Sequence, residues 1–213
     1  MRTVFSFRTL SSLVLMALLS FPCLGGIRYR DFTVRDGLSE SSVKCLTTDS
    51  RGRIWMGSWN GISIFDGHSF SYVMSSPLDD QTLTHNVINR MVEHPDGSMW
   101  VTTELGINRV DPDTRKCKRF FLGFGGGRPQ SGRFVLDISP SGDVFCCSTL
   151  RGFALWDPES DRMMPIHVLG PGSGELLALF CGEDGELFIQ NASQEVYRMS
   201  YQKEENSLQI LHT

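Results

Sequence analysis

The sequence lacks the charge pattern of a nucleic-acid-binding protein. It has 20 Lys and Arg against 24 Asp and Glu, a net charge of −4, and its basic residues form no cluster. Binding to DNA or RNA draws much of its free energy from counterions displaced by a basic surface. We therefore expect no nucleic-acid partner.

Histidine is scarce, and the five present show no common spacing: His68, His85, His94, His167 and His212. Acid–base catalysis needs a histidine or a carboxylate pair that converges on the substrate. The glycine-rich stretch Gly123–Arg128 is not followed by the Lys-Ser/Thr of a phosphate-binding loop. The sequence therefore predicts no catalytic residues and no cofactor on this chain.

The cysteines do not form a metal-binding pattern. Beyond Cys23 there are five, an odd number, with no C-x-x-C pair and no histidine at ligand spacing: Cys45, Cys117, Cys146, Cys147 and Cys181. Neighbouring side chains on a strand point to opposite faces, so Cys146 and Cys147 are poorly placed to bridge each other. We expect no metal site and buried free thiols, with a single disulfide as the alternative.

Only one long apolar run is present, at Leu10–Leu19. Arg2 and Arg8 precede it, and the small residues of Cys23–Gly26 follow. This order is typical of a secretory signal, and the run is short for a membrane span. Residues 1–26 are predicted to be a signal peptide, or alternatively an N-terminal membrane anchor. Either way residues 27–213 would be exported, to the periplasm in a bacterium.

The rest of the chain contains four copies of one pattern. Each copy is anchored on a glycine after a turn, with separations of 45, 45 and 43 residues and an aromatic residue three positions later: Gly52 with Trp55, Gly97 with Trp100, Gly142 with Phe145 and Gly185 with Phe188. In the first three copies a second glycine follows nine or ten positions after the anchor: Gly61, Gly106 and Gly152. Four aligned aromatic residues with matched glycines indicate a structural repeat.

Each copy reads as four short strands joined by turns, and helical periodicity is absent. Four-stranded units with a period of 40–45 residues are typical of a β-propeller. We therefore predict an all-β fold of about four blades, each of four antiparallel strands, near residues 40–75, 85–121, 132–169 and 174–212. The repeated glycines would form tight turns, and the repeated aromatic residues would pack between blades.

The first copy carries a family resemblance. Val43–Asp66 has the pattern V-x-x-L-x-x-D-x-x-G-x-I-W-x-G-S-x-x-G-I-S-x-F-D, which resembles the propeller repeat of bacterial two-component regulators. Upstream, Phe32–Ser39 (FTVRDGLS) is similar to the start of the exported sensor region in hybrid two-component systems of gut Bacteroidetes. The third copy departs from the pattern at Phe145–Ser148, and the fourth has Gln194 in place of the second glycine.

The resemblance implies an exported sensor of glycan breakdown products, whose full-length relatives carry further propeller blades and a histidine kinase. It also implies that this chain corresponds to the beginning of such a protein, without the kinase. Arg28–Thr33 lies at the offset of a fourth strand, while Ser207–His212 supplies the fourth copy with its own. A ring of four blades would thus leave one strand unmatched, which favours part of a larger propeller. A self-contained four-bladed ring is the alternative.

In a propeller, the turn between the second and third strands of a blade shares one face with the loop that leads to the next blade. On that face a saccharide would need flat aromatic rings and planar polar groups. The candidate ligand-binding residues are Trp59, Asn60, His85, Glu104 and Arg133. In the alternative interpretation Trp59 caps the first blade, and His85 is a turn residue.

Three classes of function remain after these exclusions. The first is a sensory domain that binds an oligosaccharide or another small ligand and signals to a kinase on further domains. The second is a propeller that binds protein instead. The third is a propeller lyase or hydrolase, which the scattered histidines make unfavourable.

Overall fold

The computed structural model describes residues 29–120, 134–148, 152–169 and 176–212. The predicted signal segment, residues 1–26, and Arg133 lie outside them. The chain divides into two units, Met1–Asp31 and Phe32–Thr213, and all of the strands lie in the second. No helix in the described ranges is long and apolar enough to cross a membrane.

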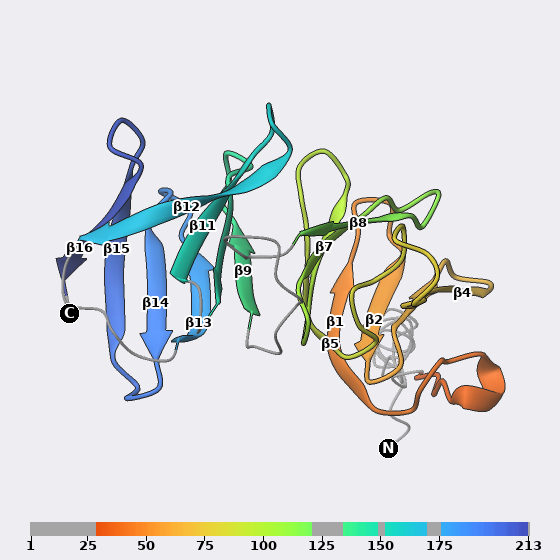
Figure 1. Cartoon of the computed structure of the whole chain (residues 1–213). Coiled ribbons are helices and arrows are strands. Elements are labelled where there is room, and N and C mark those ends of the chain that lie inside the picture. The colour runs from red at the N-terminus through yellow and green to blue at the C-terminus, as the bar shows by residue number, and fades with distance from the viewer. Residues whose placement is uncertain (1–28, 121–133, 149–151, 170–175, 213) are drawn as a thin grey trace, which may run out of the picture. The chain divides into compact units, whose positions relative to one another are not determined.

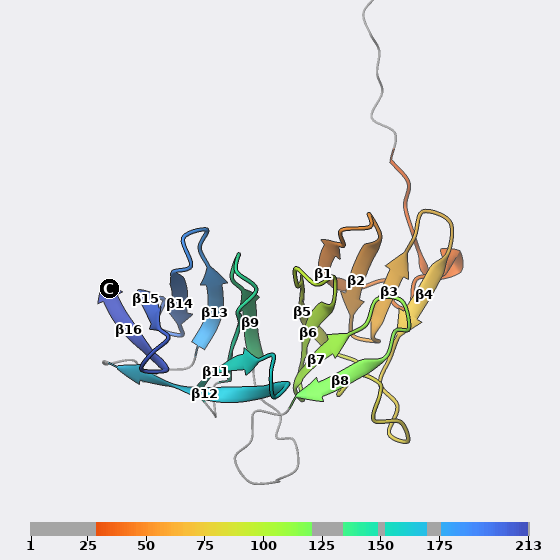
Figure 2. The same ribbon diagram turned by 90° about the horizontal axis from the view of Figure 1, so that it is seen from above.

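The described residues of the second unit form sixteen strands in four groups of four. This arrangement confirms the predicted all-β propeller blades (Figures 1 and 2). Blade 1 consists of β1 (Val43–Thr48), β2 (Ile54–Ser58), β3 (Ile62–Phe65) and β4 (Phe70–Val73). Blade 2 consists of β5 (Ile88–Glu93), β6 (Met99–Thr103), β7 (Ile107–Val110) and β8 (Cys117–Phe120). Blade 3 consists of β9 (Phe134–Ile138), β10 (Val144–Ser148), β11 (Gly152–Asp157) and β12 (Arg162–Leu169). Blade 4 consists of β13 (Leu176–Cys181), β14 (Leu187–Asn191), β15 (Val196–Gln202) and β16 (Ser207–His212).

The anchor glycine of each copy closes the turn between the first and second strands of its blade. In blade 1 the Gly52 amide donates to the Asp49 carbonyl at 2.8 Å. The φ of Gly52 is +78°, and Gly97, Gly142 and Gly185 also have positive φ. A residue with a Cβ is strained in this conformation. The spacing of the anchor glycines in the sequence therefore corresponds to one tight turn that recurs in every blade.

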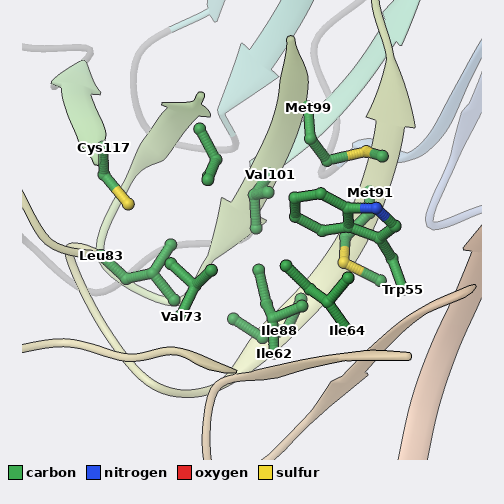
Figure 3. Packing of buried hydrophobic residues seen from close by; sticks show 11 residues of the cluster. Trp55, Ile62, Ile64, Val73, Leu83, Ile88, Met91, Met99, Val101 and Cys117 are labelled. Carbon is green, nitrogen blue, oxygen red and sulfur yellow. The ribbon is translucent and has the colours of Figure 1, made fainter. Parts of the chain in front are cut away.

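The repeated aromatic residue lies between consecutive blades in three of the four copies. Trp55 of β2 is fully buried against Ile88 and Met91 of β5 and Met99 of β6 (Figure 3). Trp100 likewise belongs to the core between blades 2 and 3, and Phe145 to the core between blades 3 and 4. These positions pack as predicted, because each turns its ring toward the following blade.

Phe188, the fourth repeated aromatic residue, departs from this rule and is only half-buried. Its neighbours Leu187 and Ile189 both belong to the core between blades 3 and 4. Successive side chains alternate across a strand, so Phe188 points to the opposite face of blade 4. On that face it lies outside the buried clusters of the described residues.

Blades 3 and 4 share one eight-stranded sheet, which the repeat did not predict. The C-terminal end of β12 pairs in parallel with β16, His167 opposite Ser207. The Asn206 side-chain amide also donates to the Pro165 carbonyl at 3.0 Å. β12 is eight residues long, whereas β4 and β8 have four each, and the extra length spans the two blades (Figure 1).

The expectation of a strand at Arg28–Thr33 is wrong for its described part, because Tyr29–Thr33 forms none. Instead Val34–Asp36 is a 3-10 turn, capped by reciprocal hydrogen bonds between Thr33 and Asp36. Gly37, at φ +108°, then ends the turn. Thr33 itself is extended, so Tyr29–Thr33 lacks a strand because it pairs with no other strand of the described residues.

The five described cysteines are free; Cys117, Cys146 and Cys147 are buried as predicted, whereas Cys45 and Cys181 are only partly buried. Burial raises the pKa of the Cys147 thiol to about 12 and that of Cys117 to about 12 as well. These thiols therefore remain protonated at neutral pH and pack as small apolar side chains.

Candidate functional site

The turn between β2 and β3 lies against the loop between blades 1 and 2. The Gly61 amide donates to the Asn86 carbonyl at 2.7 Å, which joins the two segments directly. Trp59 and Asn60 therefore share one face with His85, as the sequence predicted for a propeller. We call this surface, defined by Lys44, Trp59, Asn60, His85, Asn89 and Glu104, the loop face.

The structure describes four of the five predicted site residues. Trp59 is 54% exposed, and Asn60 is exposed with its amide donating to Ser58 Oγ at 3.0 Å. His85 Nδ1 accepts from the Val87 amide at 3.2 Å and lies 4.0 Å from Glu104 Oε2. Their role in ligand binding remains a prediction.

Two equivalent hydrogen-bond networks hold the loop face in shape. In blade 1 the Ser39 amide donates to Ser63 Oγ at 3.0 Å, and in blade 2 the Thr84 amide donates to Asn108 Oδ1 at 2.9 Å. Both bonds span 24 residues of sequence. Each network thus ties the segment before a blade to the third strand of that blade, next to Trp59 in one case and Glu104 in the other.

Sequence reasoning missed Lys44, which lies beside Trp59, and its hydrogen-bond partner Asn89. The Lys44 ammonium donates to Asn89 Oδ1 at 2.9 Å and lies 4.3 Å from the centroid of the Trp59 ring. Each residue sits at a register shift of its strand, between Val43 and Cys45 in β1 and between Ile88 and Arg90 in β5. The available signal was their common position, eight residues before the anchor glycine of each copy.

The long loop between blades 1 and 2 is held in place by Arg119 of β8. Its guanidinium donates to the carbonyls of Thr82 at 2.7 Å, Asp79 at 2.7 Å and Leu83 at 3.1 Å. The Cys117 amide also donates to the Gln81 carbonyl at 2.7 Å. One cation thus satisfies several loop carbonyls, and the loop leading to His85 is fixed against blade 2.

A separate hydrogen-bond network, centred on Asp137, connects the innermost strands of blades 2, 3 and 4. Asp137 of β9 accepts from Arg90 Nη2 at 3.0 Å and from the Cys181 amide at 2.9 Å. The Arg90 guanidinium also lies 5.1 Å from the centroid of the Phe180 ring. These contacts place a charged pair and an aromatic ring among the inner strands of three blades.

On the opposite side, the short turns of blades 1 and 2 border an open concavity of about 910 Å³. Arg51 and Asp113 pair there through charge-assisted hydrogen bonds. Both side chains are more than half exposed, so the pair contributes little to stability. The other charged side chains that line the concavity include both cations and carboxylates, and they favour no particular ligand. Within the described ranges no group of three His, Cys, Asp or Glu residues is arranged to hold a metal ion.

Four blades of four antiparallel strands define a β-propeller domain. Residues 37–60 match the family model described as "Two component regulator propeller". The chain therefore carries a repeat of this family, and the resemblance seen at Val43–Asp66 is confirmed.

A curated relative and two solved structures point to the same class. "Histidine kinase P4" of Formosa agariphila is 38% identical over 56 residues, which are 26% of this chain and 4% of that protein. The extracellular domain described as part of a hybrid two component system of Bacteroides thetaiotaomicron superposes with a TM-score of 0.67 at 20% identity, covering 86% of this chain and 26% of that one. A second such domain from the same organism has a TM-score of 0.62 at 17% identity, with 81% and 26% covered. The chain thus spans about a quarter of these structures and a small part of the kinase.

Proposed function

We propose that this chain is the exported ligand-sensing propeller region of a two-component sensor and that its loop face binds a small glycan-derived ligand. The observation that carries the proposal is Trp59, a large aromatic side chain left 54% exposed beside Lys44, which in turn donates to Asn89. Single exposed apolar residues are common, but the Lys44 ammonium lies 4.3 Å from the centroid of this ring and is itself hydrogen-bonded to Asn89.

The chemistry of the loop face suits a saccharide. A sugar ring presents an apolar face to an aromatic platform and hydroxyl groups to planar polar side chains. Trp59 supplies the platform, while Asn89 and the His85–Glu104 pair supply donors and acceptors. We assign His85 and Glu104 to binding rather than to catalysis.

In this proposal the signal passes to a kinase carried by other domains, and residues 1–26 direct the chain to the periplasm. The resemblance to extracellular sensor domains supports both points. Half-buried Phe188 supports a further partner, because the equivalent residues Trp55, Trp100 and Phe145 are each covered by the next blade. We propose that another blade of the same kind covers Phe188.

Isothermal titration of the purified chain with neutral and acidic oligosaccharides tests the binding proposal. We expect the wild-type chain to bind at least one of them and Trp59→Ala to weaken that binding at least tenfold, in the range measured for interface anchors. Met164→Ala, which truncates a 45% exposed side chain on β12, is the matched control and should bind normally. The proposal is overturned if the wild-type chain binds no oligosaccharide, or if both variants bind as the wild type does.

A further inference from the structure

The Lys44 ammonium is held on the loop face by backbone geometry. The register shift between Val43 and Cys45 leaves Lys44 without a partner position on β2. The same irregularity recurs between Ile88 and Arg90 in blade 2, where it places Asn89 in the equivalent position, and between Leu176 and Ala178 in blade 4. A β-bulge re-aims the side chain it carries and is common next to functional sites. Two such bulges, 45 residues apart, bring Lys44 Nζ to 2.9 Å from Asn89 Oδ1.

The positive charge of Lys44 is not balanced by a carboxylate of the described residues, since none of their ion pairs involves it. Its two contacts, the Asn89 amide oxygen and the Trp59 ring at 4.3 Å, are both with neutral groups. An ammonium has three N–H donors, so these contacts leave donor capacity for a ligand. The acidic side chain of the loop face, Glu104, faces His85 at 4.0 Å.

We infer that the ligand of the loop face is an anionic saccharide, whose carboxylate or sulfate group contacts Lys44 while a sugar ring lies against Trp59. This inference rests on the proposed function and adds the charge of the ligand to it. Hydrogen bonds between an ammonium and an anionic oxygen are stronger than those between neutral groups. The adjacent aromatic platform adds orientation, because the ring and the anionic group of one sugar are then recognised together.

The test uses the full chain and saccharides in matched pairs. Oligosaccharides that contain uronic acid are compared with their carboxyl-reduced forms, and sulfated oligosaccharides with their desulfated forms. We expect one acidic member to bind at least tenfold more tightly than its neutral counterpart, and the pair that shows the difference identifies carboxylate or sulfate as the group recognised. The preference should fall as the salt concentration rises, because both charges lie at the surface.

Lys44→Gln should remove the preference, weakening the binding of the acidic saccharide about tenfold more than that of the neutral form. Lys44→Arg keeps the charge and should retain most of the preference. Lys116→Gln makes the same change of charge on the opposite side, in the lining of the 910 Å³ concavity, and should bind like the wild type. Thermal unfolding of each variant checks that the exposed substitutions leave the fold intact.

Each outcome decides between the two proposals. If acidic and neutral members bind equally and Lys44→Gln has no effect, the anionic ligand is overturned while glycan binding stands. If no saccharide binds, the proposed function fails, and this inference fails with it. A preference for acidic saccharides that is lost equally in Lys44→Gln and Lys116→Gln would also overturn the inference, since it would reflect net charge and not contact with Lys44.

Discussion

The indole Nε1 of Trp55 donates a hydrogen bond to Asp49 Oδ2 at 2.8 Å. Asp49 is 5% exposed and also accepts from the Arg53 amide at 2.9 Å and from Arg53 Nε at 2.7 Å. One repeat later His94 stands in place of Asp49, and Trp100 Nε1 is buried with no hydrogen-bond partner among the described residues. The same buried tryptophan is thus satisfied in blade 1 and unsatisfied in blade 2.

We predict that Asp49→Ala lowers the free energy of unfolding by about 3 kcal/mol, because it leaves the buried indole N–H of Trp55 and the Nε of Arg53 without their acceptor. Urea unfolding followed by tryptophan fluorescence measures the change. Asp66→Ala is the matched control: Asp66 also accepts backbone hydrogen bonds in a turn, but it is exposed, and its loss should cost about 1 kcal/mol or less. Equal losses in both variants would contradict the role assigned to Asp49.

Gln194 has a φ of +65°, the left-handed conformation that Gly61 and Gly152 adopt at the equivalent turn. Gln194→Gly should stabilise the protein by about 0.5–1 kcal/mol. The backbone strain that it relieves in the folded state exceeds the conformational entropy that a glycine adds to the unfolded chain. In the reverse change, Gly152→Ala, the added Cβ meets no atom within 4 Å. The variant should therefore lose about 1 kcal/mol of stability from backbone strain alone. Thermal unfolding of the two variants should shift in opposite directions, and shifts in the same direction would refute this account.

Asp161 links blades 2 and 3 by accepting from Trp156 Nε1 at 2.9 Å and from Arg109 Nη2 at 3.1 Å. Burial alone would raise its pKa, but hydrogen bonds from Lys118 and Trp156 and the charge of Arg109 outweigh burial and lower the pKa below 3.8. A carboxyl group whose pKa is lowered by folding contributes stability above its unfolded pKa and loses it as the pH falls through the folded pKa.

The wild type should therefore exceed Asp161→Asn in unfolding free energy by a constant amount above about pH 5, and the difference should shrink as the pH falls below about 4. Urea unfolding of both proteins at pH 7, 5, 4 and 3 measures the difference. Asparagine tolerates the φ of +50° found at this position, so the comparison isolates the charge. A difference that stays the same from pH 7 to pH 3 would show that the Asp161 charge does not stabilise the fold.

Arg119→Lys should release the loop between blades 1 and 2, because a lysine cannot reach the several carbonyls that the guanidinium spans. Amide hydrogen exchange in residues 76–83 should speed up at least tenfold, while exchange in β6 stays slow. Arg51→Lys changes an arginine of the exposed pair with Asp113 and should leave loop exchange unchanged. Unchanged exchange at residues 76–83 in Arg119→Lys would contradict the proposed restraint.

The candidate site was predictable only in part. Trp59 and His85 were placed on one face because loops in a propeller follow from strand order, and their segments do meet through Gly61 and Asn86. Lys44 and Asn89 were not found, since alternation along an ideal strand does not reveal a bulge. Arg133 lies outside the described residues.

The sequence by itself determined the propeller class, the four blades and the buried role of Trp55, Trp100 and Phe145. Turns and strand alternation depend on residues that are close in sequence, so a pattern that repeats every 45 residues is enough to predict them. Only the tertiary structure decided which polar groups meet: Lys44 with Asn89, Asp137 with Arg90, and β12 with β16. These contacts join residues distant in sequence, and their geometry depends on how the blades pack, which no local pattern encodes.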